Sequence, residues 1–227
     1  MPEQTAGTFT QSPAATAFSA LYGRALNYVG APTDTDATTI AKEGIVAGIK
    51  RINTRTWSWS LAAATVTFVS GESGREYLVA TNFKSPRSFE LLDASSRIAG
   101  RLYWEDPKTF DRDFENRASA NDPTHYTVFN PFDNGYLTIN AAPTAAWVVS
   151  YPTGRLRYYK RVAFLSADAE VLAAPTEVEE FLVWHARMVL AAHFDFDKLP
   201  FAERQAERFW RDLIRDDVTH SLRDWTE

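Results

Sequence analysis

The chain has 227 residues, 45% of them hydrophobic, a formal net charge of −5 and no cysteine. The missing cysteine excludes disulfide scaffolds, thiol catalysis and cysteine-ligated zinc, and the negative charge argues against a general nucleic-acid-binding protein, whose affinity depends on cationic contacts to phosphate. No basic segment precedes an apolar run at the N-terminus, and no stretch approaches the roughly 20 apolar residues of a membrane span. We therefore expect synthesis in a cytoplasm and one compact protein with two lobes.

The first helix is predicted over residues 13–29. Ser12 and Pro13 fit an N-cap followed by proline at the first helical position, where its missing N–H costs nothing. Gly30 fits a left-handed stop after the helix.

The second helix is expected to be capped by Asp36 and to end near the tryptophans at positions 57 and 59. Gly44 and Gly48 each cost about 1 kcal/mol against alanine in a helix, so their presence predicts close packing against a neighbour. Isoleucines at spacings of four and three predict one buried face: Ile45, Ile49 and Ile52.

Trp57 and Trp59 flank a serine where the helical period ends. On a strand the two indoles share a face, which suits stacking on a ligand or a partner; on a helix they diverge. The simpler interpretation is a helix-to-sheet junction filled by large aromatic side chains. An exposed pair would favour an interface.

The middle of the chain changes from a period of 3.6 to a period of 2, which indicates strands. Asn134-Gly135 is the best hairpin signal, and residues 71–74 offer a looser reversal. These features predict an α+β fold, with a helical bundle built from the N- and C-terminal helices and an inserted antiparallel β-sandwich or small barrel of about six to eight strands. The predicted strands cover residues 65–69, 76–79, 89–92, 98–104, 126–129, 136–139, 146–151 and 155–160.

Two helices follow the strands. Thr176 and Glu179 fit a capping box that opens the third helix. Its apolar stripe contains Phe181, Leu182, His185 and Val189. The last helix is predicted to start near Pro200, with Phe209, Leu213 and Ile214 as its anchors.

Four arginines share one face of the last helix. Two interpretations stay open: ion pairs within the helix, from Glu207 to Arg211 and from Asp212 to Arg215, or contacts to carboxylates of a neighbouring subunit. A contact to the DNA backbone is a third and weaker alternative. The four positions follow the spacing i, i+4, i+7 and i+11: Arg204, Arg208, Arg211 and Arg215.

The last twelve residues, 216–227, mix charges with Leu222 and Trp225. A tail that stays in solvent does not require a tryptophan. Terminal segments commonly become ordered only when they are bound. Docking into a partner is one interpretation, and packing on the parent subunit is the other.

Signatures of catalysis are weak. The histidines at 125, 185, 193 and 220 never take the i, i+4 spacing of a helical zinc site, and no P-loop, G-x-G-x-x-G or G-x-S-x-G motif is present. The nearest enzyme signal is an acidic stretch that begins at Trp104, because glycosidases place carboxylates beside aromatic rings. Its carboxylates are Glu105, Asp106, Asp111, Asp113 and Glu115. We expect no enzymatic activity, cofactor or metal.

The order of several segments resembles the head-to-tail adaptor proteins of tailed bacteriophages, including the head-completion and tail tubular proteins of short-tailed phages. The resemblance covers roughly residues 18–215 and lies in the order of the pieces rather than in any one of them. The acidic insertion between Trp104 and His125 has no match in that pattern. The matching segments are 25–30, 45–59, 77–84, 126–143, 148–160, 165–168 and Pro175.

The resemblance implies a structural virion protein, assembled in the host cytoplasm and placed at the head-tail junction. Such subunits form a ring, commonly dodecameric, beneath the portal protein. The ring extends a channel through which DNA passes without sequence specificity, and it provides the platform for a neck, nozzle or tail protein. The domains expected are N-terminal helices at 1–60, an inserted β domain at 61–165, C-terminal helices at 166–215 and a docking tail at 216–227.

On this basis the expected interface residues are the four arginines of the last helix, Leu222 and Trp225 of the tail, and Trp57 and Trp59. One alternative is a carbohydrate-binding or hydrolytic tail component that uses the acidic and aromatic loop around Trp104. Another is a free-standing cytoplasmic domain with a binding role. Loss of turnover on a polysaccharide after conversion of Glu105 and Asp106 to amides would favour the first alternative.

Overall fold

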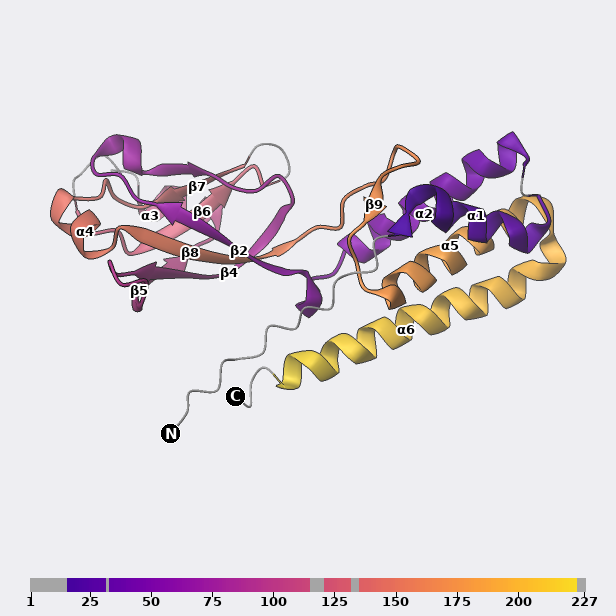
Figure 1. Ribbon diagram of the computed structural model, residues 1–227. Helices are drawn as coiled ribbons and strands as arrows, with labels where there is room; N and C mark the ends of the chain where they lie inside the picture. The colour runs from indigo at the N-terminus through magenta and orange to yellow at the C-terminus, as the bar shows by residue number, and fades with distance from the viewer. Residues whose placement is uncertain (1–15, 32, 115–120, 132–134, 224–227) are drawn as a thin grey trace. The chain divides into compact units, whose positions relative to one another are not determined.

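The computed structural model describes residues 16–31, 33–114, 121–131 and 135–223, except for the side chains of 219–223. The chain divides into two compact units, shown in Figure 1: a helical unit of residues 1–55 and 162–227, and a β unit of residues 56–161. The four long helices and the seven-stranded sheet therefore lie in different units, which confirms the α+β fold class.

The helical unit is a bundle of four helices with a short two-stranded ladder. Helix α5 contacts the other three helices, and the ladder pairs Thr16 with Leu172 and Ala17 with Val171. Within the described residues, no helix is long and apolar enough to cross a bilayer. The helices are α1 (Phe18–Val29), α2 (Thr35–Asn53), α5 (Thr176–Phe194) and α6 (Leu199–Arg223); the strands are β1 (Thr16–Ala17) and β9 (Val171–Leu172), and the short 3₁₀ helix η3 covers Phe196–Lys198.

Helix α2 packs closely on α5 at the two glycines, as their presence in the helix predicted. A Cβ added at Gly44 would lie 2.8 Å from the backbone Cα of Ala186, and one at Gly48 would lie 2.7 Å from Leu182 Cδ2. Ile45, Ile49 and Ile52 of α2 are fully buried, as expected. Small residues at the contact therefore let the apolar face of α2 approach α5.

The starts of α1 and α2 differ from the predictions. Residues 16 and 17 form strand β1, so α1 begins at Phe18 and not at 13; Ser12 and Pro13 lie outside the described residues. Asp34, not Asp36, caps α2, because its Oδ1 accepts a hydrogen bond of 2.7 Å from the backbone N–H of Ala37.

The predicted capping box at the start of α5 is wrong. Pro175 holds the N-cap position of α5 and Thr176 is its first helical residue, so the Thr176 hydroxyl is one position too late to act as the cap. The C-terminal stop of α1 is confirmed, since Gly30 has φ 72° and its N–H donates to Leu26.

The β unit is one curled sheet of seven strands in the order β2-β8-β4-β5-β6-β7-β3. Its core is rich in aromatic side chains, with Phe68 in contact with Phe89 and Trp147. The strands are β2 (Leu61–Thr67), β3 (Glu76–Leu78), β4 (Phe83–Leu92), β5 (Ile98–Trp104), β6 (His125–Phe129), β7 (Tyr136–Ile139) and β8 (Thr153–Lys160), with helices α3 (Pro107–Asp113) and α4 (Ala145–Ser150) and 3₁₀ helices η1 (Ser58–Ser60) and η2 (Glu72–Gly74).

The pairing departs from an all-antiparallel sheet at β5 and β6, which run parallel through Tyr103↔His125 and Trp104↔Tyr126. Because α3 lies between these strands, the connection is long enough to return the chain in the same direction. Strands β6 and β7 pair antiparallel as the hairpin signal predicted, although Asn134 itself lies outside the described residues.

Two further expectations change. Residues 145–150 form helix α4 instead of a strand, because the Thr144 side chain caps the helix at Trp147 N–H (3.1 Å) and Trp147 turns into the core. The reversal at 71–74 is the 3₁₀ turn η2, with Gly71 at φ 86°. It joins β2 and β3, which lie at opposite edges of the sheet.

Candidate functional site

The acidic stretch after Trp104 organises a helix. Asp106 is the N-cap of α3 and accepts hydrogen bonds of 3.1 Å from the backbone of Lys108 and Thr109. Hydrogen bonding from Thr109 holds the pKa of Asp106 below its usual range, and the Arg112 partner does the same for Asp113. A glycosidase acid needs a raised pKa, so these two carboxylates suit a structural role rather than acid catalysis. Glu115 lies outside the described residues.

His185 is part of the α2–α5 contact. Its Nδ1 donates a hydrogen bond of 2.9 Å to the carbonyl of Gly44, and the ring is buried. Desolvation lowers the pKa of His185 below its ordinary value, although the bond to Gly44 acts in the opposite direction. The described residues contain no cluster of three or more potential metal ligands.

Acidification is expected to weaken the helical unit through His185. The pKa of His185 is lower in the folded chain than in the unfolded chain. Neutral His185 therefore makes its full contribution to the free energy of unfolding above the unfolded-state pKa of about 6.5. This contribution is lost as the pH falls through the folded-state pKa. Chemical denaturation followed by helical circular dichroism between pH 7.5 and 5 measures it. The variant His185→Gln should show a shallower fall, whatever its stability at pH 7.5; an equal slope would contradict the assignment.

Trp57 and Trp59 do not form an exposed aromatic platform. Their rings stack with centroids 6.2 Å apart and planes 25° apart, and Trp57 is only 2% exposed. Trp59 is half-buried. This geometry agrees with the simpler interpretation, in which both indoles fill the entry to the sheet.

Two arginines of the α6 stripe pair within their own helix. Asp212 lies 3.8 Å from Arg208 and 3.1 Å from Arg215, and Arg215 also lies 3.5 Å from Asp216. The side chains of both arginines remain largely exposed. This part of the stripe fits the first interpretation, in which ion pairs form within the helix.

The other two arginines differ. Arg204 and Arg211 each donate through Nε to the backbone carbonyl four residues earlier, at 3.2 and 3.3 Å. The expected partner of Arg211, Glu207, instead pairs with Arg51 of α2 at 2.8 Å. Among the described residues neither Arg204 nor Arg211 has an ion pair, so these two guanidinium groups remain available to a partner.

Helix α6 extends beyond the bundle. Among the residues of α6 whose side chains the structure describes, up to 218, Leu213 is the last buried one. The helix continues for ten residues beyond it, about 15 Å. Figure 1 shows this end of α6 continuing past the start of α5. Leu222 lies on this extension, with a side chain outside the described residues, and Trp225 follows it, also outside them.

One face of the sheet carries arginines around a buried carboxylate. Glu90 on β4 is 5% exposed, and its Oε2 lies 2.7 Å from Arg155 and 3.8 Å from Arg157 on β8. Arg101 stands opposite Glu90 on β5. The sequence signal for this cluster is the spacing of Arg155 and Arg157, two residues apart and therefore on one face of the strand.

Conversion of Glu90 to glutamine is expected to destabilise the β unit by about 2 kcal/mol, because it leaves two arginines without their buried counter-charge. Chemical denaturation followed by tryptophan fluorescence measures the change. The matched control is Asp113→Asn, which removes one carboxylate from an exposed pair with Arg112 and should cost at most about 0.5 kcal/mol. Equal effects would show that Glu90 has no special role.

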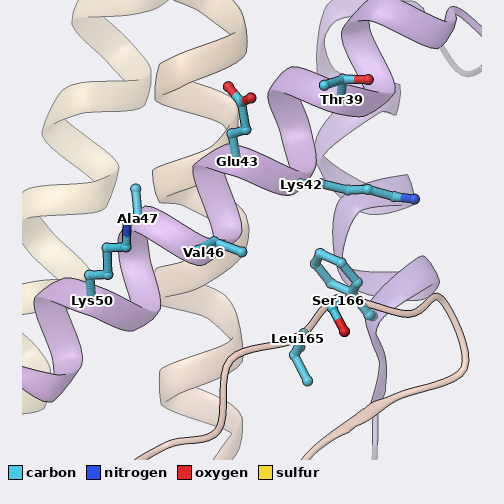
Figure 2. Close-up of a pocket in the computed structure, with 9 residues that line it drawn as sticks. Thr39, Lys42, Glu43, Val46, Ala47, Lys50, Leu165 and Ser166 are labelled. Atoms are coloured by element: carbon cyan, nitrogen blue, oxygen red, sulfur yellow. The ribbon is translucent and has the colours of Figure 1, made fainter.

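An open groove of about 540 Å³ lies along α2. Figure 2 shows Lys42, Val46 and Lys50 spaced four residues apart along α2, with Leu165 and Ser166 supplied by the segment before β9. This four-residue spacing is the sequence signal for the groove, because residues four apart share one face of a helix. The remaining residues that line the groove are Phe18, Thr39, Glu43 and Ala47.

A family model described as SU10 adaptor protein matches residues 16–226, which span both structural units. No curated protein matches the chain.

Proposed function

This chain belongs to the SU10 adaptor protein family, a family of phage head-tail adaptors, and we propose that twelve copies close into a ring beneath the portal protein. In that position the ring extends the DNA channel and gives the neck, nozzle or tail protein its attachment platform. The observation that carries the proposal is the family match across both units. The protein would then be a structural part of the virion that joins the head-tail junction after assembly in the host cytoplasm.

The distribution of charge supports a passive channel. The helical unit has 12 lysines and arginines against 18 aspartates and glutamates, whereas the β unit has 12 against 11. Carboxylates repel phosphate, so a wall formed by helical units lets DNA pass without binding it. A solved ring with a channel lined by lysine and arginine would contradict this arrangement.

The extension of α6 supports attachment to the portal. The described side chains that follow Leu213 on α6, 214–218, are not buried, so this part of the helix can bind another protein without disturbing its own bundle. Arg204 and Arg211, which have no ion pair within the described residues, lie on the same helix as further contacts. We propose that the last turns of α6 and the tail with Trp225 bind the portal.

Electron microscopy of purified virions, or of the protein mixed with its portal, tests the proposal. The expected result is a symmetric ring of this chain between portal and tail. A virion without this chain at the vertex would overturn the structural role. A matched test of the passive channel is filter binding of the assembled ring to duplex DNA, which should be weak.

A further inference from the structure

The two lysines that line the α2 groove differ in their ion pairing. Lys42 is already paired with Asp168 at 2.7 Å, whereas Lys50 is exposed and has no ion pair among the described residues. Beside it lie the apolar side chains of Val46 and Leu165. The groove therefore combines an apolar floor with a free ammonium group at the Lys50 end, and it suits a segment in which an apolar side chain stands beside a carboxylate.

The same unit carries a protrusion of this composition. Phe196 on η3 is 73% exposed, and the next residue, Asp197, is exposed and also without an ion pair among the described residues. The turn is held firmly, because Lys198 pairs with Asp195 at 2.7 Å and donates a hydrogen bond of 3.1 Å to the carbonyl of Tyr28. An exposed phenylalanine on a fixed turn loses little conformational entropy when a partner covers it.

Phe196 and the groove cannot meet within one copy. The turn is fastened to Tyr28 at the end of α1, while the groove contains Phe18 at the start of α1. Ten residues of helix separate these points by about 15 Å. Two complementary patches at different places on one unit allow a head-to-tail contact between copies. Contacts of this type can close into a ring.

We infer that Phe196 of one copy inserts into the α2 groove of the next copy, with Asp197 beside Lys50. The inference rests on the proposed ring and names the surfaces through which its helical units associate. The apolar contact supplies the attraction, and the pairing of Asp197 with Lys50 sets the register.

Crosslinking provides the test, because the chain has no cysteine of its own. In the double variant Lys50→Cys with Asp197→Cys, a short bismaleimide added to portal-bound protein should produce a ladder of covalent multimers. Each single variant, with one cysteine, should yield no ladder beyond dimers. A control double variant with Lys108→Cys in place of Lys50→Cys, at an exposed lysine of the β unit, should also yield none.

A second measurement separates the contact from the folding of the chain. Charge reversal by Lys50→Glu or by Asp197→Lys is expected to reduce the number of subunits bound per portal about tenfold at limiting concentration, and the combination of both should restore it. Unchanged circular dichroism would show that the bundle is intact. Normal rings in both charge-reversal variants, together with no ladder from the double-cysteine variant, would overturn the inference and leave the proposed function standing. Absence of any ring with the unmodified protein would overturn both.

Discussion

Alanine at position 44 is expected to lower the free energy of unfolding of the helical unit by about 2 kcal/mol. Alanine gains about 1 kcal/mol over glycine in a helix, but its Cβ would stand 2.8 Å from Ala186 Cα and 3.2 Å from Ala186 Cβ. Because the first of these atoms belongs to the backbone of α5, the helices must separate, at a cost of about 3 kcal/mol. The separation would also lengthen the hydrogen bond from His185 to the Gly44 carbonyl.

Gly23 supplies the matched control. It lies within α1, and an added Cβ there has no neighbour within 4 Å, so Gly23→Ala should stabilise the chain by about 1 kcal/mol. Gly48→Ala should fall between the two, since the obstructing atom is the movable end of the Leu182 side chain. Urea denaturation followed at 222 nm measures all three. Equal effects at 44 and 23 would show that the α2–α5 approach is not limited by size.

Periodic patterns predicted the helical unit well because burial there follows one repeat. The isoleucine stripe of α2 marked the buried face, and the two glycines marked the point of closest approach. The caps were harder to place. Asp34 and Asp36 are chemically equal candidates two residues apart, and only the path of the preceding loop selects Asp34.

The β unit shows where short patterns fail. Residues 145–150 contain too few positions for a period to separate helix from strand, and the choice of helix depends on Trp147 reaching Phe68 and Tyr151 in the core. The parallel β5–β6 pair was hidden for a similar reason. The parallel pairing depends on helix α3, and the acidic sequence of that segment is also typical of a solvated loop.

For the candidate interface residues too, the sequence predicted positions along a helix but not the contacts between segments distant in the chain. The spacing of the α6 arginines correctly placed them on one helix. It could not show that Glu207 pairs with Arg51, so that Arg211 has no ion pair within the part of the chain that the structure describes. The α2 groove is built from segments more than 100 residues apart in the sequence. Such a surface becomes visible only when the fold brings α2 and Leu165 together.

Removal of residues 216–227 is expected to weaken binding to the portal more than tenfold while leaving the bundle folded. Of the deleted residues, those with described side chains, 216–218, are not buried. We therefore expect the bundle core to remain and the thermal midpoint of the helical unit to change by no more than about 2 °C. Surface plasmon resonance against immobilised portal measures the loss. A less drastic pair, Leu222→Ser with Trp225→Ser, should reproduce most of it, because deeply buried aromatic side chains dominate the affinity of protein interfaces.

The control for this loss is Arg211→Ala in the full-length chain, which changes an exposed side chain of the same helix outside the deleted segment. If the tail is the principal contact, this variant should weaken binding less than the deletion does. Full affinity in the deletion would place the portal contact elsewhere on the chain. A greater loss of affinity in Arg211→Ala would assign the main contact to the arginine stripe. The Arg211 guanidinium, which has no ion pair among the described residues, would then pair with a carboxylate of the portal.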